Sequence, residues 1–198
     1  MKFNALVDAS SAILLFKAGA FDLLAEAYKL AMAPSVFKEV CVPGRAGADY
    51  FTRAHQQGLL SLVSLDPTAY GPFVPGDRHL GDGERQTLLA FSQGMAAFII
   101  LDDRRAAQFC QESAIPFINA LLAVKILNLR GYLSDPDHGR ISAEVVRVGY
   151  YSRWVIRYAA DFSPLMLDRF HRRIGKTAPR LSPKQGSWLE PVPDTASR

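Results

Sequence analysis

The sequence predicts an α/β protein of three layers, with helices on both faces of a central, mostly parallel sheet of four to five strands. Short apolar segments typical of strands alternate with segments that have helical periodicity. The segment 97–101 is continuously apolar, as a central parallel strand covered on both faces must be. With 198 residues, 49% of them hydrophobic, the chain can bury one good core and a small appendage, but not two full domains.

The first half of the chain begins with a strand over residues 3–8 that ends in Asp8. Ser10 or Ser11 is the expected N-cap of a helix over 12–16, which Gly19 ends. There follow a helix over 21–30, a strand over 30–33, and a helix that Pro34 begins. A helix over 46–57 and an edge strand over 59–65 come next. Residues 66–80 contain three prolines and two glycines, which predicts a loop.

The second half repeats the alternation. We expect a helix over 81–94, the central strand over 97–101, a helix over 104–113 and a strand over 115–118, whose Pro116 indicates a sheet edge. A helix over 120–130 ends at Gly131. These elements predict a body over 1–138, a helical C-terminal extension over 139–175 with helices at 142–158 and 164–174, and a disordered basic tail over 176–198.

Charge is unevenly distributed along the chain. Residues 147–198 hold ten Lys or Arg against four Asp or Glu, whereas residues 1–146 hold thirteen against fifteen, and the whole chain has a net charge of +4. A basic end on a mildly acidic body is typical of a protein that acts on a polyanion, although it could also only aid solubility.

The two cysteines and the apolar runs point to the cytoplasm. Cys41 and Cys110 have no CxxC or Cys/His spacing, so we interpret them as buried thiols in a reducing compartment rather than zinc ligands. No apolar run reaches the roughly 18 residues that a membrane span needs, and the first residues are too short for a signal-peptide core.

Acidic residues stand at four places where a strand meets a helix. They are Asp8, Glu39, Glu84 and the pair Asp102 and Asp103. Parallel sheets gather the residues beyond the carboxyl ends of their strands into one crevice. Carboxylates that converge there with no Lys or Arg nearby repel one another unless a divalent cation neutralises them. The pattern therefore predicts a metal site.

Each of these acids also has a simpler interpretation. Asp8 could only cap the helix after it, and Asp102-Asp103 could cap the helix at Arg104. Glu39 could be a solvated helix residue, and Glu84 a first-turn acid favoured by the helix dipole. The four together favour the metal site, because the simpler interpretation needs four coincidences at crevice-facing positions. Asp82 is expected only to be an N-cap.

Four stretches of the chain together resemble the PIN domain, the fold of the VapC-type toxin ribonucleases, and are most similar to a PIN subfamily long catalogued only as a domain of unknown function. They are Val7-Asp8-Ala9-Ser10-Ser11, Ala33-Pro34-Ser35-Val36-Phe37-Lys38-Glu39-Val40, Leu80-Gly81-Asp82-Gly83-Glu84-Arg85-Gln86-Thr87-Leu88 and Ile100-Leu101-Asp102-Asp103-Arg104-Arg105-Ala106-Ala107. The resemblance covers residues 3–134. One departure is Asn119-Ala120-Leu121-Leu122, where the subfamily often has Gly-Thr-Leu-Gly.

The resemblance implies a PIN-like nuclease domain with a set of catalytic acids, namely Asp8, Glu39, Glu84 and either Asp102 or Asp103. We expect Asp8 and Asp102 to bind Mg²⁺ or Mn²⁺ directly, with Glu84 as a further ligand or acting through water, and Asp103 as a replacement for Asp102 or its support. Glu39 is a ligand or acts through water. One or two ions would supply a nucleophilic hydroxide and neutralise charge at phosphorus.

Substrate contacts are expected beside these acids. Ser10 lies where the family often has a side chain that supports the first Asp. Arg104 and Arg105 could contact the phosphate of a bound strand or simply be solvated.

The extension carries arginines interleaved with aromatic residues, a mixture that suits single-stranded RNA. At helical spacing, however, Val148, Tyr151, Val155 and Tyr158 form a stripe, and we favour packing of this stripe on the body or a second subunit.

The sequence thus predicts a metal-dependent endoribonuclease that hydrolyses RNA phosphodiester bonds, as the toxin of a VapBC-type pair. The family resemblance implies a small antitoxin partner and a homodimer. Two alternatives remain: a housekeeping RNA-processing PIN nuclease without an antitoxin, and a non-catalytic module that binds RNA or protein.

Overall fold

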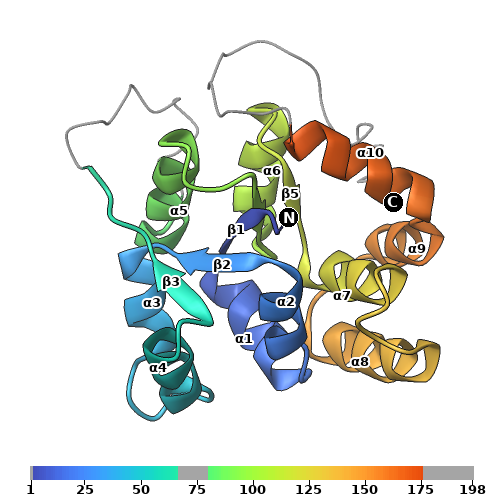
Figure 1. The fold of residues 1–198 in the computed structure, drawn as a ribbon, viewed down its shortest axis with the longest axis horizontal. Helices are drawn as coiled ribbons and strands as arrows, with labels where there is room; N and C mark the ends of the chain where they lie inside the picture. Colours follow the sequence, from blue (N-terminus) through green and yellow to red (C-terminus); the bar gives the residue numbers. More distant parts are fainter. Residues whose placement is uncertain (1, 67–79, 176–198) are drawn as a thin grey trace, which may run out of the picture.

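The computed structural model describes residues 2–66 and 80–175 (Figure 1). Its centre is a five-stranded, all-parallel sheet with the strand order β3-β2-β1-β4-β5. The strands are β1 (Asn4–Val7), β2 (Lys29–Met32), β3 (Leu60–Leu62), β4 (Phe98–Ile100) and β5 (Phe117–Ile118). β3 and β5 are the two edges, as expected from segment 59–65 and from Pro116.

The sheet is covered on both faces, which explains why its central strands are apolar throughout. In the register of β1 with β4, Leu6 lies opposite Ile99, and both side chains enter one core cluster. Their neighbours Ala5 and Val7 point the other way, into a second and larger cluster. Side chains alternate between the two faces of a strand, so each strand contributes to both cores.

The helices form the outer two layers. The smaller core cluster is closed by α5 (Asp82–Ser92) and α6 (Arg104–Glu112). The larger one is closed by α1 (Ala9–Lys17), α2 (Phe21–Ala27), α3 (Pro34–Val40) and α7 (Ala120–Leu129), with α4 (Ala48–Gln56) against β3. Figure 1 shows α3 and α4 near β3, and α7 to α10 gathered on the opposite side. The predicted three-layer α/β/α fold is therefore confirmed.

The C-terminal region differs from the sequence prediction in one respect. The helix expected over 142–158 is two helices, α8 (Asp135–Val148) and α9 (Arg153–Asp161), followed by α10 (Pro164–Ile174). Ser134 caps α8 by accepting a hydrogen bond from the amide of Asp137, and Pro136 stands in the first turn, where it costs no hydrogen bond. The Pro- and Asp-containing segment before the expected domain boundary is thus a helix start.

The domain boundary expected after residue 138 consequently falls inside α8. The extension packs on the body: Val148, Tyr151 and Tyr158 are half-buried against the larger core, and Trp154 stacks on Tyr158 with ring centroids 5.3 Å apart. The tail predicted over 176–198 lies outside the described residues. None of the described helices is both long and apolar enough to cross a membrane.

Candidate active site

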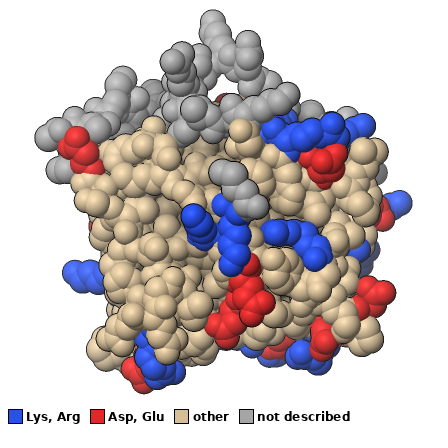
Figure 2. All heavy atoms as spheres, in the orientation of Figure 1, with Lys and Arg blue, Asp and Glu red and all other residues tan. Residues whose placement is uncertain are grey.

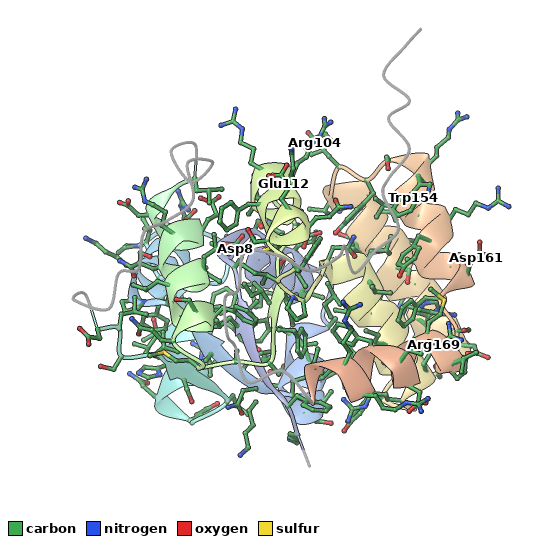
Figure 3. All side chains as sticks on the ribbon, turned by 90° about the horizontal axis from the view of Figure 1, so that it is seen from above. Asp8, Arg104, Glu112, Trp154, Asp161 and Arg169 are labelled. Carbon is green, nitrogen blue, oxygen red and sulfur yellow. The ribbon has the colours of Figure 1, made fainter. Side chains whose placement is uncertain are left out.

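A groove of about 760 Å³ opens where β1 and β4 end and four helices begin. We call it the acidic groove. Figure 3 shows Asp8 between α5 and α6. The described residues that line the groove come from the starts of α1, α5 and α6, from both ends of α3 and from the turn after α3: Asp8, Ala9, Ser10, Pro34, Ser35, Lys38, Glu39, Val42, Gly81, Asp82, Gly83, Glu84, Gln86 and Asp103.

Asp8 is fixed by the end of β1. Its amide donates to the carbonyl of Ile100 at 2.9 Å, which continues the ladder between β1 and β4 by one residue. Its carboxylate accepts hydrogen bonds from the hydroxyl of Ser10 at 2.6 Å and the amide of Ser10 at 3.3 Å. Asp8 itself is therefore the N-cap of α1, where Ser10 or Ser11 was expected. Ser10 supports Asp8, as the family resemblance implies.

The packing of α3 on α5 brings Glu39 to the same groove as Glu84. The amide of Ser35 donates to Oε1 of Gln86 at 3.0 Å, and its hydroxyl donates to a backbone carbonyl at the start of α5 at 3.2 Å. A Cβ on Gly83 would lie 3.3 Å from a methyl group of α3 and 3.8 Å from Oε2 of Glu39. A glycine at this position therefore allows the two helices to approach closely.

Three of the groove's acids already have partners within the chain. Glu84 accepts a hydrogen bond from the amide of Gly81, so it closes the first turn of α5. Glu39 lies 3.3 Å from a guanidinium nitrogen of Arg45, and Asp82 pairs with Arg85. The first helical residue of α5 is Asp82, and its N-cap is Gly81, whereas Asp82 was expected to be the cap.

The two neighbouring aspartates after β4 point to different surroundings. Asp103 lines the acidic groove and caps α6, because its Oδ1 accepts from the amides of Arg105 at 2.8 Å and Ala106 at 2.9 Å. Asp102, expected as a direct metal ligand, is not among the groove's lining residues.

The carboxylate of Asp102 is instead directed into the protein. It accepts from the hydroxyl of Ser11 at 2.6 Å, from the amide of Ala120 at 3.1 Å and from the hydroxyl of Tyr151. These three donors occupy both of its oxygens. The structure thus brings together Asp8, Glu39, Glu84 and Asp103, and leaves Asp102 behind them.

Burial and mutual repulsion dominate the electrostatics of the groove. Asp8 is only 7% exposed, and burial raises the pKa of its carboxyl, an effect that Ser10 opposes and the charge of Glu39 strengthens. Burial also raises the pKa of Glu84, and the charges of Asp8 and Asp103 raise it further. Acids that shift one another's pKa in this way share one local field.

Cations lie closer to the acids than the sequence pattern indicates. Lys38 lines the groove, and Arg45 and Arg85 each pair with one of its acids. By contrast, Arg104 and Arg105 are exposed and do not line the groove, and Figure 3 shows Arg104 at the edge of the molecule, away from Asp8. Figure 2 shows Lys and Arg beside Asp and Glu on the face seen in Figure 1, separated by uncharged surface.

Sequence reasoning missed Ser35, Lys38, Asp82 and Gln86 as groove residues. A signal for the first two was present: both follow Pro34 within the first turns of a helix that starts at the carboxyl end of a strand. Asp82 and Gln86 flank Glu84 at the start of a helix where the pattern of acids drew attention to Glu84 alone.

The chemistry of the groove suits a hard divalent cation, because the described residues that line it offer carboxylate, hydroxyl and amide oxygens and no thiol or imidazole. In the described residues, no three acidic, histidine or cysteine side chains meet closely enough to hold an ion as they stand. Glu84 and Glu39 would first have to turn from Gly81 and Arg45. Asp8 and Asp103 already face the groove with their carboxylates fixed by helix amides.

Comparison with known proteins gives one result. No curated protein and no solved structure matches the chain significantly. A family model described as a PIN domain matches residues 4–142, which is more than half of the 198 residues and includes all five acids among the described residues that line the groove. The helices α9 and α10 lie beyond the match. The chain belongs to the PIN domain family.

Proposed function

We propose that this protein is a metal-dependent endoribonuclease. PIN domains are generally nucleases, and such nucleases typically use divalent metals. The observation that carries the proposal is the convergence of Asp8, Glu39, Glu84 and Asp103 from four separate segments on one groove. A purely structural protein has no need for this arrangement, since burial and repulsion work against it.

The roles follow from how each side chain is held. Asp8 and Asp103 would hold the ion, because helix amides and Ser10 fix their direction. Glu84 and Glu39 would join as ligands or through water. The bound cation, Mg²⁺ or Mn²⁺, lowers the pKa of water and neutralises charge at the phosphate. Lys38, at the groove wall, is placed to contact a phosphate oxygen of the substrate.

Several finer features of the proposal rest on the order of the four motifs rather than on the groove. We place the protein among VapC-type toxins that act on cellular RNA in the cytoplasm, as a homodimer silenced by a small antitoxin. The two free cysteines, Cys41 and Cys110, fit a reducing compartment. Arg104 and Arg105 remain candidates for contacts with RNA that leaves the groove beside α6.

Cleavage of RNA by the purified protein tests the catalytic proposal. We expect cleavage with Mg²⁺ or Mn²⁺, none with EDTA, and a loss of at least about a hundredfold in Asp8→Asn, since that change removes a fixed charge at the ion. Glu112→Gln on α6 is the matched control, because Glu112 is an exposed acid outside the groove. Binding of RNA without cleavage in any metal would instead favour the non-catalytic module.

Expression in cells separates the toxin from a housekeeping nuclease. Growth arrest that disappears with Asp8→Asn, together with a neighbouring reading frame for a small protein that relieves the arrest, is the expected result. Active enzyme that leaves growth unaffected would contradict the toxin role while leaving the nuclease in place. The mass of the purified protein in solution tests the homodimer.

A further inference from the structure

A tyrosine outside the family match contacts the turn that carries Asp103, one of the acids of the groove. Tyr151 lies in the connection between α8 and α9, nine residues past the last matched residue. Its hydroxyl donates a hydrogen bond to Oδ1 of Asp102, which is 49 residues away in the sequence. Asp102 immediately precedes Asp103, the acid that faces the groove.

The carboxylate of Asp102 joins three parts of the chain behind the groove. The hydroxyl of Ser11 reaches it from α1 and the amide of Ala120 from the start of α7, both on Oδ2. Tyr151 is the donor to the other oxygen. Ser11 is also the neighbour of Ser10, which holds Asp8. The Asp102 carboxylate is therefore connected to the supports of both fixed acids of the groove.

The local backbone makes room for the Tyr151 ring. Gly149 ends α8, and a Cβ placed on it would lie 2.5 Å from Cε2 of Tyr151 and 3.0 Å from the carbonyl oxygen of Val145. Any side chain at this position would push the ring from its place, since real Cβ contacts are not this short. The ring itself is packed against the larger core, so its hydroxyl is held in one direction.

We infer that Tyr151 is a positioning residue of the active site, which acts through Asp102 to fix the turn that carries Asp103. The inference rests on the proposed function, because it assigns Tyr151 a role toward the ion that Asp8 and Asp103 would hold. It also gives the connection between α8 and α9 a role in the site, since this segment beyond the family match adds to the support of the groove. Tyr151 is not a catalytic residue, because it does not line the groove.

Tyr151→Phe tests this inference, since phenylalanine keeps the ring and removes only the donor. We expect the Kd for Mn²⁺, measured by titration of the purified protein without RNA, to rise about tenfold, the lower end of what loss of an outer support costs. In RNA cleavage, kcat should fall by a similar factor while KM for RNA stays unchanged. Tyr158→Phe is the matched control, because Tyr158 is also a half-buried tyrosine packed on the core.

Gly149→Ala provides a second variant that leaves Tyr151 in the chain but displaces its ring. Gly149→Ala should also raise the Kd for Mn²⁺. If Tyr151 affected only the overall stability, variants that are fully folded at the assay temperature would bind Mn²⁺ as the wild type does. Unchanged Mn²⁺ affinity and kcat in Tyr151→Phe, with an active wild type, would overturn the inference and leave the nuclease standing. A wild type that neither binds Mn²⁺ nor cleaves RNA would overturn both.

Discussion

The neighbouring aspartates after β4 allow a sharp division between a site residue and a structural one. Asp103→Asn removes the charge from the acidic groove but keeps the helix cap, because asparagine caps as well as aspartate. The unfolding free energy of Asp103→Asn should differ from that of the wild type by less than about 0.5 kcal/mol. Asp103→Ala loses the helix cap, so its unfolding free energy should fall by about 1 kcal/mol. For a chain of this length that loss lowers Tm by about 2–4 °C.

Asp102→Asn should behave in the opposite way. The partly buried carboxylate accepts three hydrogen bonds. An amide nitrogen at Oδ2 would face the backbone amide of Ala120, which can only donate, and at Oδ1 it would force the Tyr151 hydroxyl to accept instead of donate. In either orientation the remaining bonds go to a neutral acceptor, and a bond to a charged group contributes about 1.5–3 kcal/mol against about 0.5–1.5 kcal/mol for a neutral one. Burial raises the pKa of Asp102, so loss of its charge returns part of that cost, and we expect a net loss of at least about 1 kcal/mol.

Thermal unfolding in EDTA and Mn²⁺ titration of the folded proteins measure the two effects separately. Asp103→Asn should keep its Tm and lose most of its Mn²⁺ binding. Asp102→Asn should unfold several degrees earlier, with weakened but measurable binding. If Asp102→Asn abolished binding at an unchanged Tm while Asp103→Asn bound Mn²⁺ normally, the roles assigned to the two residues would be reversed and the geometric argument refuted.

Three further outcomes are expected from the site and its surroundings. Arg45→Ala should change the free energy of unfolding by less than about 1 kcal/mol, since the pair of Arg45 with Glu39 is half-exposed. It should also tighten Mn²⁺ binding by no more than about fivefold, because Glu39 is then free to turn to the ion. Weaker Mn²⁺ binding in a titration would show instead that Arg45 supports the site. Burial raises the pKa of the Cys110 thiol, so native protein should react with a thiol reagent at one cysteine and unfolded protein at two; two fast thiols in the native state would contradict this burial. Burial raises the pKa of Asp8 and Glu84 above their unfolded values of 3.8 and 4.5, so their protonation favours the folded state, and the metal-free protein should gain stability as pH falls from 7 toward those unfolded values. Urea unfolding of Asp8→Asn with Glu84→Gln should show a smaller gain, because the double variant keeps Asp102, whose pKa burial also raises. An equal gain in this double variant would assign it to Asp102 and other groups.

The order of strands and helices could be predicted because it depends on local properties. Three features depend only on neighbouring residues: the apolar run of β4, the proline that begins α3 and the proline beside the edge strand β5. Each can be explained by backbone geometry or burial without knowledge of the rest of the chain. The convergence of Asp8, Glu39 and Glu84 followed from one further rule, that the carboxyl ends of parallel strands meet at one edge.

That Asp103 rather than Asp102 lines the groove could not be predicted in the same way. Consecutive residues leave the end of a strand in different directions, and a change of one residue in where α6 begins decides which carboxylate enters the groove. The donors that hold Asp102 come from α1, from α7 and from Tyr151, far apart in the sequence. Likewise, the break between α8 and α9 at Gly149 interrupts a helical pattern that continues on both sides.

The structure also changes the electrostatic argument for the site. Clustered acids were expected to tolerate one another only through a divalent ion, yet each has a partner of its own: Ser10 and helix amides hold Asp8, Arg45 pairs with Glu39, the Gly81 amide binds Glu84, and two further amides of α6 bind Asp103. We therefore expect the metal-free protein to be folded. An ion must compete with the partners of Glu39 and Glu84, so its binding free energy is the carboxylate–metal attraction less the cost of releasing those two side chains. If the groove binds a cation as proposed, we expect the ion to bind reversibly rather than as a permanent structural part.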